Sequence, residues 1–186
     1  MVLSYQLKTG IAPVVTTNND TGIAVLDHSG LFYDNYAARE GESVSSFGAT
    51  GTFGQFTGRA ASSSGNLIFF TAALKPAIGP AVPAVFQMKN AGFARQTLAT
   101  GGTTAGTTGQ KYVSFPALSE ANGVALYKAF LTGPAARNES LWRGNTLELR
   151  EGDFLDPVKL PGVKLGSITR FWPAGTQIIV QASLTG

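Results

Sequence analysis

Short runs of apolar residues, bounded by glycine, proline or polar residues, recur along most of the chain. They are rich in β-branched and aromatic side chains, which favour strands over helices. Several alternate apolar and polar positions, as strands with one buried face do. The runs that predict strands are residues 23–26, 31–33, 67–71, 85–88, 111–115, 147–150, 158–160, 163–165, 168–171 and 177–182.

The spacing of these runs predicts the fold class. Strands recur roughly every ten residues toward the C-terminus and are separated by turn residues, such as the Pro161-Gly162 pair. Such spacing is typical of all-β proteins. We therefore expect a mainly β fold, an antiparallel β-sandwich or barrel with long loops and at most one short helix.

Residues 119–133 support two interpretations. Ser119 can cap a helix, apolar residues then recur at helical spacing, and Gly133 with Pro134 ends the pattern. The pair Asn122-Gly123 is also the strongest short signal for a β-hairpin turn. Both readings stand, and the paired end signals favour the helix.

Three segments are expected to be extended or looped. They are an N-terminal segment, a Pro-rich arm near residues 75–85 and a Gly/Thr-rich connection over 99–109. The prolines of the arm favour an extended backbone that pairs poorly inside a sheet. A single β-rich domain over 1–186 is the simplest organisation, with a possible boundary near 99–110.

The small number of charged residues, and their distribution along the chain, add to this picture. Only 13% of the 186 residues are charged, against about 25% in an ordinary soluble domain. No acidic residue occurs between Glu42 and Glu120. A surface so poor in charge is suited to contact with other subunits, and we expect this stretch to make such contacts. The net charge of +3 is not gathered into a basic cluster, which argues against direct nucleic-acid binding.

The chain has no cysteine, which excludes disulfides, thiolate metal sites and cysteine nucleophiles. The first residues lack the basic and apolar regions of a secretory signal, and no run approaches the length of a membrane helix. We expect synthesis in the cytoplasm and no membrane partner.

The candidate chemical motifs are incomplete. The glycine-rich residues 48–58 lack the Lys-Ser/Thr pair of a phosphate-binding loop, so Phe47, Phe53 and Phe56 are expected to pack on a core or a partner. His28 is the only histidine and is read as a turn residue, since imidazole metal sites usually need two or three.

Five carboxylates gather toward the C-terminus, interleaved with three arginines, which indicates ion pairing on one surface rather than acid–base catalysis. The acids are Glu139, Glu148, Glu151, Asp153 and Asp156, and the bases are Arg137, Arg143 and Arg150.

The low-charge, Gly/Thr/Ala-rich β composition, the absence of cysteine, the Met start without a leader and the Pro-rich arm together resemble a bacteriophage virion structural protein. Within that class the chain is most similar to capsid decoration (cement) proteins, which are small β-rich subunits that commonly form trimers on the outside of a shell. The resemblance is one of composition over the whole chain and carries over no individual residue.

The sequence therefore predicts a non-enzymatic virion protein without cofactor or metal, a homotrimer that stabilises a phage capsid by bridging the major capsid protein or other virion subunits. A tail or baseplate component is one alternative. A glycan-binding β-sandwich that uses Trp142 and Trp172 is another. The expected contact residues are Arg59, Pro76, Pro80, Pro83, Phe86, Trp142 and Trp172.

Overall fold

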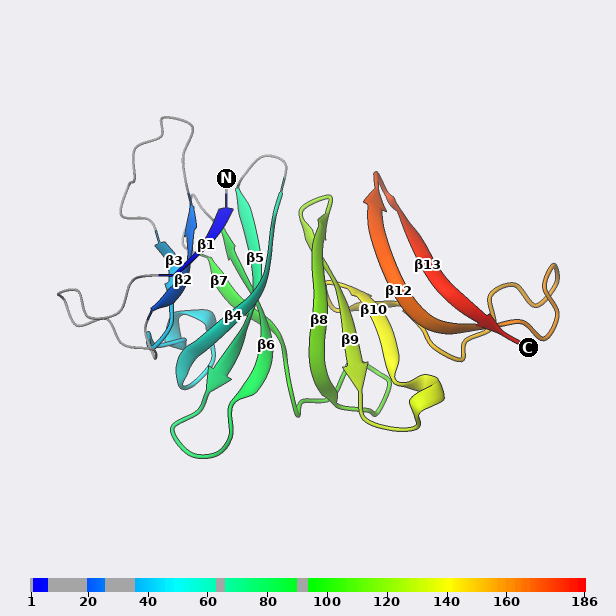
Figure 1. Ribbon diagram of the computed structural model, residues 1–186, viewed down its shortest axis with the longest axis horizontal. Helices are drawn as coiled ribbons and strands as arrows, with labels where there is room; N and C mark the ends of the chain where they lie inside the picture. The colour runs from blue at the N-terminus through cyan, green and yellow to red at the C-terminus, as the bar shows by residue number, and fades with distance from the viewer. Residues whose placement is uncertain (1, 7–19, 26–35, 63–65, 90–93) are drawn as a thin grey trace. The chain divides into compact units, whose positions relative to one another are not determined.

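The computed structural model describes residues 2–6, 20–25, 36–62, 66–89 and 94–186. The chain divides into two compact units, 1–100 and 101–186, which are described separately. Almost all regular structure is β, and the strands form antiparallel sheets (Figure 1). Within each unit these open sheets stack face to face. This arrangement confirms the expected mainly β, sandwich-type fold, and no barrel closes within the described residues.

The described residues of the first unit form seven strands and one short 3-10 turn. Strands β1 to β3 form one sheet and β4 to β7 form a second, each in sequence order. Their bounds are β1 Val2–Gln6, β2 Thr21–Val25, β3 Tyr36–Arg39, η1 Ser45–Phe47, β4 Thr52–Ala61, β5 Leu67–Lys75, β6 Val82–Lys89 and β7 Arg95–Thr100.

The second unit repeats this plan. Strands β8 to β11 form a four-stranded sheet in sequence order, and β12 with β13 forms a hairpin. The bounds are β8 Tyr112–Ala121, β9 Val124–Leu131, η2 Ala135–Arg137, β10 Glu139–Arg143, β11 Thr146–Arg150, β12 Lys164–Ala174 and β13 Gln177–Thr185.

A cluster of phenylalanines forms the centre of the first unit. Phe47, Phe53, Phe70 and Phe86 are almost fully buried and Phe56 packs beside them, with paired ring centroids 5.1 to 5.9 Å apart. Most pairs are edge-to-face or tilted, the geometry that the ring quadrupole favours. Residues of β2 and β3 join the same core, so the first sheet stacks on the second. The expectation that the glycine-rich segment places its phenylalanines on a core is confirmed.

The predicted helix at 119–133 is wrong. The residues form the hairpin β8–β9, and Asn122 and Gly123 turn the chain with φ of 51° and 80°. Two consecutive positive φ values are what a two-residue hairpin turn with matching strand twist requires. The local Asn-Gly signal therefore outweighs the helical spacing of the apolar residues.

Other boundaries also differ from the sequence expectations. Pro83 lies inside β6, at a position paired with β5. The pairing of β6 with β7 begins only at Ala84, so the missing N–H of Pro83 leaves no gap in the β6–β7 ladder. The Pro-rich arm is thus reduced to a short loop between two paired strands. Residues 158–160 form a turn rather than a strand. The predicted strand at 31–33 and His28 lie outside the described residues.

One connection occurs three times and joins the last strand of each sheet to the first strand of the next. A glycine two residues after the strand has φ of 82 to 85°, and its N–H donates to the carbonyl of a buried residue in the next sheet, 2.7 to 2.8 Å away. That residue's N–H donates back to the carbonyl of the residue after the glycine, at 2.8 to 3.0 Å. The three pairs of this glycine joint are Gly41 with Phe53, Gly102 with Tyr112, and Gly152 with Leu165.

The hairpins that follow the joints share one register. Leu118 of β8 lies opposite Tyr127 of β9. The equivalent pair of the last hairpin, Phe171 opposite Val180, lies 53 positions later along the chain. Arg59 opposite Phe70 is the matching pair of β4 and β5. Both C-terminal hairpins end in the same Leu-Thr-Gly, at residues 131–133 and 184–186. The described chain is therefore built from a repeated sheet, complete in β4–β7 and β8–β11.

We predict that the joint glycines are required for their backbone conformation. Gly102→Ala should lower the free energy of unfolding by about 1 kcal/mol, because an L side chain is strained at this φ, while a Cβ there meets no atom within 4 Å. Urea denaturation measures the change. Gly102→Asn is the control, since asparagine tolerates this conformation better. Equal losses for the two variants would contradict the explanation.

Candidate interaction surface on the C-terminal hairpin

An ion pair between strands fixes the C-terminal hairpin onto the β8–β11 sheet. Lys128 of β9 lies 2.8 Å from the carboxylate of Glu139 on β10, and both side chains are largely buried. Glu139 also accepts hydrogen bonds from the Ser167 hydroxyl at 2.8 Å and from the backbone N–H of Ile168 at 2.6 Å. Lys128 donates to the Ile168 carbonyl at 2.5 Å. The pair thus satisfies the backbone of β12 at the point where this strand crosses the sheet.

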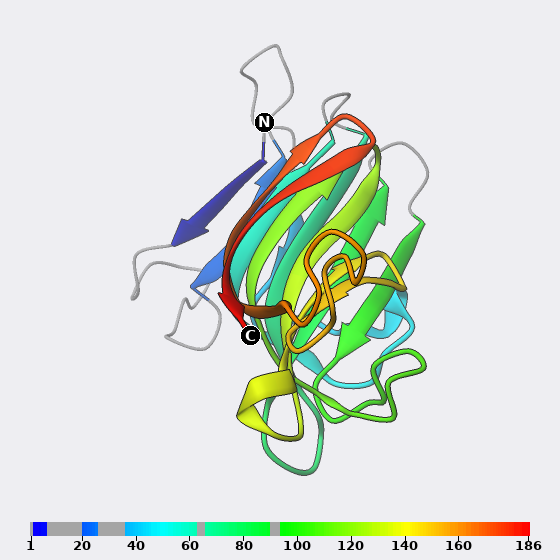
Figure 2. The same ribbon diagram turned by 90° about the vertical axis from the view of Figure 1, so that its right-hand side faces the viewer.

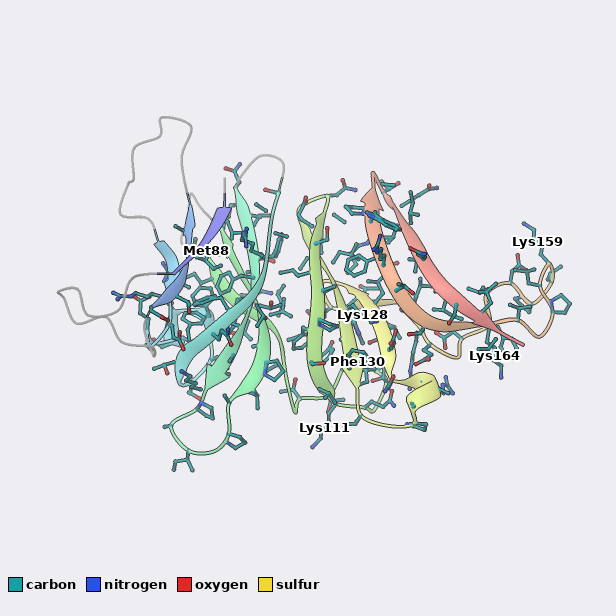
Figure 3. The ribbon with its side chains drawn as sticks, in the orientation of Figure 1. Met88, Lys111, Lys128, Phe130, Lys159 and Lys164 are labelled. Atoms are coloured by element: carbon teal, nitrogen blue, oxygen red, sulfur yellow. The ribbon has the colours of Figure 1, made fainter. Side chains whose placement is uncertain are left out.

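The environment of Glu139 favours its charged form. Burial raises the pKa of the carboxyl, but the Lys128 ammonium, the Ser167 hydroxyl and the Ile168 amide together hold the pKa below its ordinary value. The ammonium of Lys128 also lies 5.1 Å from the ring centroid of Phe130, its neighbour on β9 (Figure 3). The charges at this position are therefore paired and serve to hold the hairpin.

Apolar packing completes the attachment of the hairpin. Leu126 and Leu141 of the sheet form a buried cluster with Leu165 and Ile168 of β12, and Val180 of β13 packs against it. Figures 1 and 2 show the hairpin lying along one side of the sheet within this unit. One face of β12–β13 is thus used to cover the sheet.

The opposite face of the hairpin is exposed, and we call it the outer face. Cross-strand partners lie on the same face of a sheet, so Trp172 opposite Ile179 and Arg170 opposite Gln181 form one surface. Trp172 is 44% exposed and Ile179 is 57% exposed. Two large apolar side chains thus lie side by side on a solvent-facing sheet.

Comparison with the preceding hairpin shows what this face corresponds to. Ser119 and Leu126 form the cross-strand pair at the position of Trp172 and Ile179. Leu126 is fully buried, because β12 covers it. The outer face is therefore equivalent to the face of β8–β9 that packs on β12, but no described residues cover it.

Further exposed apolar side chains lie near this hairpin in the sequence. Of the ten large apolar residues exposed in the described structure, seven lie between positions 154 and 184. They are Phe154, Leu155, Val158, Leu160, Trp172, Ile179 and Leu184. Of these seven residues, Trp172 and Ile179 are cross-strand partners and form a contiguous apolar pair on the outer face.

A shallow groove of about 350 Å³ adjoins the β12–β13 turn and is lined by Arg143, Glu148, Leu149 and residues 176–178. Arg143 pairs with Glu148 at 2.8 Å and donates to the Thr176 carbonyl at 3.2 and 3.3 Å. Its guanidinium is thus held by the chain and ties the turn to the sheet.

The residues expected to contact other subunits are scattered. Phe86 and Trp142 are buried, and Trp142 donates through Nε1 to the Ser140 hydroxyl at 2.8 Å. Their rings are therefore used inside the chain, and the sugar-stacking alternative is left with Trp172. Arg59 lies exposed on β4, Pro76 and Pro80 lie in the β5–β6 loop, and Pro83 is half-buried in β6. Trp172 alone of the set lies on the outer face.

The acidic and basic residues near the C-terminus do pair, as their interleaving predicts. Arg143 binds Glu148, and Arg137 lies 3.7 Å from Asp153. The described residues contain no group of three or more His, Asp or Glu that could hold a metal ion. No helix among them is long and apolar enough to cross a membrane.

Ile179 and the glycine joints are absent from the sequence-based expectations. The signal for them was the recurrence of Arg-Glu-Gly at 39–41 and 150–152 and of Leu-Thr-Gly at 131–133 and 184–186. Internal repeats of this kind identify equivalent positions. They would have aligned Ile179 with the buried Leu126.

Comparison with known proteins gives one match. Residues 9–157, most of the chain, match a protein family described as a family of unknown function (DUF7453). No curated protein and no solved structure matches the chain.

We predict that the Lys128–Glu139 pair stabilises the second unit at neutral pH. Glu139→Gln should lower the free energy of unfolding by about 3 kcal/mol, because it leaves the Lys128 charge buried without its counter-ion. Since the folded pKa of Glu139 is lowered, its contribution exists above the unfolded pKa and is lost as the pH falls through the folded pKa. Urea denaturation between pH 7 and pH 3 should show the wild type and variant converging in acid.

Glu148→Gln is the matched control for this prediction. Glu148 belongs to a more exposed pair, so its loss should cost only about 0.5 kcal/mol. A gap between wild type and Glu139→Gln that stays constant down to pH 3 would contradict the assignment.

Proposed function

The chain belongs to the DUF7453 family of unknown function, and we propose that it is a non-enzymatic structural protein that bridges neighbouring subunits of a larger assembly. The observation that supports this proposal is the outer face of the C-terminal hairpin. An exposed Trp and Ile pair on a rigid sheet is the kind of anchor that protein interfaces bury at their centre.

The positive charge of the hairpin and of the loop before it indicates the chemistry of the partner. After Asp156 the chain contains Lys159, Lys164 and Arg170 but no acidic residue. Lys159 lies in the loop before β12 and Lys164 begins that strand (Figure 3). A partner surface with apolar residues and a rim of carboxylates would complement this part of the chain.

The finer proposal is a virion protein that binds the outside of a phage capsid. It is supported by the low-charge, cysteine-free β composition. Each subunit would bind the assembled shell but not free capsid subunits, and so stabilise the shell by mass action. The major capsid protein is then the partner, and a position on the tail is the nearest alternative within the same class.

We predict that the chain co-sediments with tailed-phage capsids stripped of their own decoration proteins and raises their melting temperature. Trp172→Ala and Ile179→Ser should each weaken binding at least tenfold, because both remove apolar anchors. Ile78→Ser is the control, since Ile78 is 93% exposed in a loop of the first unit and its loss should change nothing. Failure to sediment with any capsid would refute the capsid role, and equal loss for Ile78→Ser would refute the assigned face.

Glycan binding is a second candidate, favoured by the exposed ring of Trp172 between polar neighbours Arg170 and Gln181. A flat aromatic ring with adjacent hydrogen-bonding groups can stack on a sugar. Signal on a glycan array that Trp172→Ala abolishes and Trp172→Phe partly retains would support this function. No signal across a broad array would exclude it.

A further inference from the structure

We propose that Asn122 is a modification site, at which the side-chain amide is lost through a cyclic imide formed with Gly123, and that Glu120 assists this reaction as a base. The chain itself is the substrate, and water is the only co-reactant. The proposal concerns the tip of the β8–β9 hairpin and does not rest on the function proposed above.

The turn between β8 and β9 leaves the reacting groups accessible. Asn122-Gly123 is the only Asn-Gly pair in the chain, and it forms this turn with positive φ at both residues. Asn122 is exposed, so water reaches its carboxamide. Glycine has no side chain to shield its backbone nitrogen from the Cγ atom of the preceding asparagine. Attack of this nitrogen on the carboxamide is therefore least hindered here.

A carboxylate contacts the nitrogen that must attack. The N–H of Gly123 donates a hydrogen bond to Oε1 of Glu120, which is the last residue but one of β8. A general base must lie within hydrogen-bond reach of the proton that it removes. The Glu120 carboxylate meets this condition, because the proton in question is the one that it already accepts in the hydrogen bond.

The reaction balances within these groups and water. The Gly123 nitrogen forms a bond with Cγ of Asn122, and the bond between Cγ and Nδ2 breaks. The proton that Glu120 takes from the Gly123 nitrogen passes to the leaving amino group, which departs as ammonia. Water then opens the imide at either of its carbonyl groups. The product has aspartate or isoaspartate at position 122.

The modification removes a contact between two hairpin tips. Nδ2 of Asn122 donates to the carbonyl of Gly175, in the β12–β13 turn, at 2.7 Å, and the two residues lie 53 positions apart. They therefore occupy equivalent positions in successive hairpins. An ionised aspartate has no donor for this carbonyl and places a negative charge beside its oxygen. Isoaspartate also lengthens the backbone of a two-residue turn. Both products therefore separate the tips.

Incubation of the wild-type chain tests the site and contains its own control. Trypsin releases the two turn asparagines, Asn122 and Asn145, in peptides 112–128 and 144–150, which contain no other asparagine or glutamine. Asn145 lies between β10 and β11 but precedes Thr146, whose branched side chain hinders attack. At pH 8 and 37 °C, peptide 112–128 should gain about one dalton at least tenfold faster than peptide 144–150. Mass spectrometry measures both rates, and equal rates would overturn the assignment of the site.

Substitution of Glu120 tests the base. Glu120→Gln keeps an oxygen that can accept from the Gly123 N–H but removes the carboxylate, so the modification should slow at least threefold. Glu148→Gln is the matched control, since Glu148 pairs with Arg143 and its loss should leave the rate unchanged. A Glu120→Gln rate equal to that of the wild type would overturn the role of Glu120.

Hydrogen exchange tests the consequence for the hairpin tips. In Asn122→Asp, and in wild-type chain modified by incubation, the backbone amides of residues 174–177 should exchange at least threefold faster than in fresh wild type, because the β12–β13 turn loses its anchor. Asn145→Asp is the control, since it adds the same charge in the β10–β11 turn and should leave these amides unchanged. Unchanged exchange in both modified samples would overturn the proposed separation of the tips.

Discussion

The glycine joint is the constraint on which the stacking of the sheets depends. Within each unit, a backbone with φ near 84° turns the chain out of one sheet, and the paired hydrogen bonds of Gly41 or Gly152 fix the first strand of the next sheet. The residue that receives these bonds is Phe53 or Leu165, and each is buried. The joint therefore couples backbone geometry to the placement of the first apolar side chain of each new sheet.

The β8–β11 sheet has two faces that carry different kinds of side chain. On one face, Leu126 and Leu141 pack against β12. The other face carries an aromatic group, which consists of Tyr112, Phe115, Tyr127 and Trp142. The Lys128–Glu139 pair adds polar contacts to β12 that apolar packing cannot supply. The last hairpin repeats the pattern up to its outer face, where the forward neighbour is missing from the described residues.

Much of the strand content could be predicted from the sequence, because β-branched and aromatic runs bounded by glycine describe strands locally. At 119–133 the sequence permitted both a helix and a hairpin and favoured the helix, since helical spacing and the Asn122-Gly123 turn signal conflict, and the backbone decides for the hairpin. The repeat was not predicted because the loops between each joint glycine and the next strand differ in length. The sequence could not separate Trp142 from Trp172 among the expected contact residues, because the burial of one and the exposure of the other depend on stacking, not on local sequence.

Part of the stretch without acids between Glu42 and Glu120 lies in the core of the first unit. This stretch contains β5, in which residues 68–72 are all buried, and the phenylalanine cluster around it. A run of consecutive buried residues has no place for unpaired carboxylates. Burial therefore accounts for the missing acids in β5, whereas the exposed loop residues 77–80 of the same stretch are also free of acids. Of the ten large apolar residues exposed in the described structure, seven lie from Phe154 onward, and the last acidic residue of the sequence is Asp156.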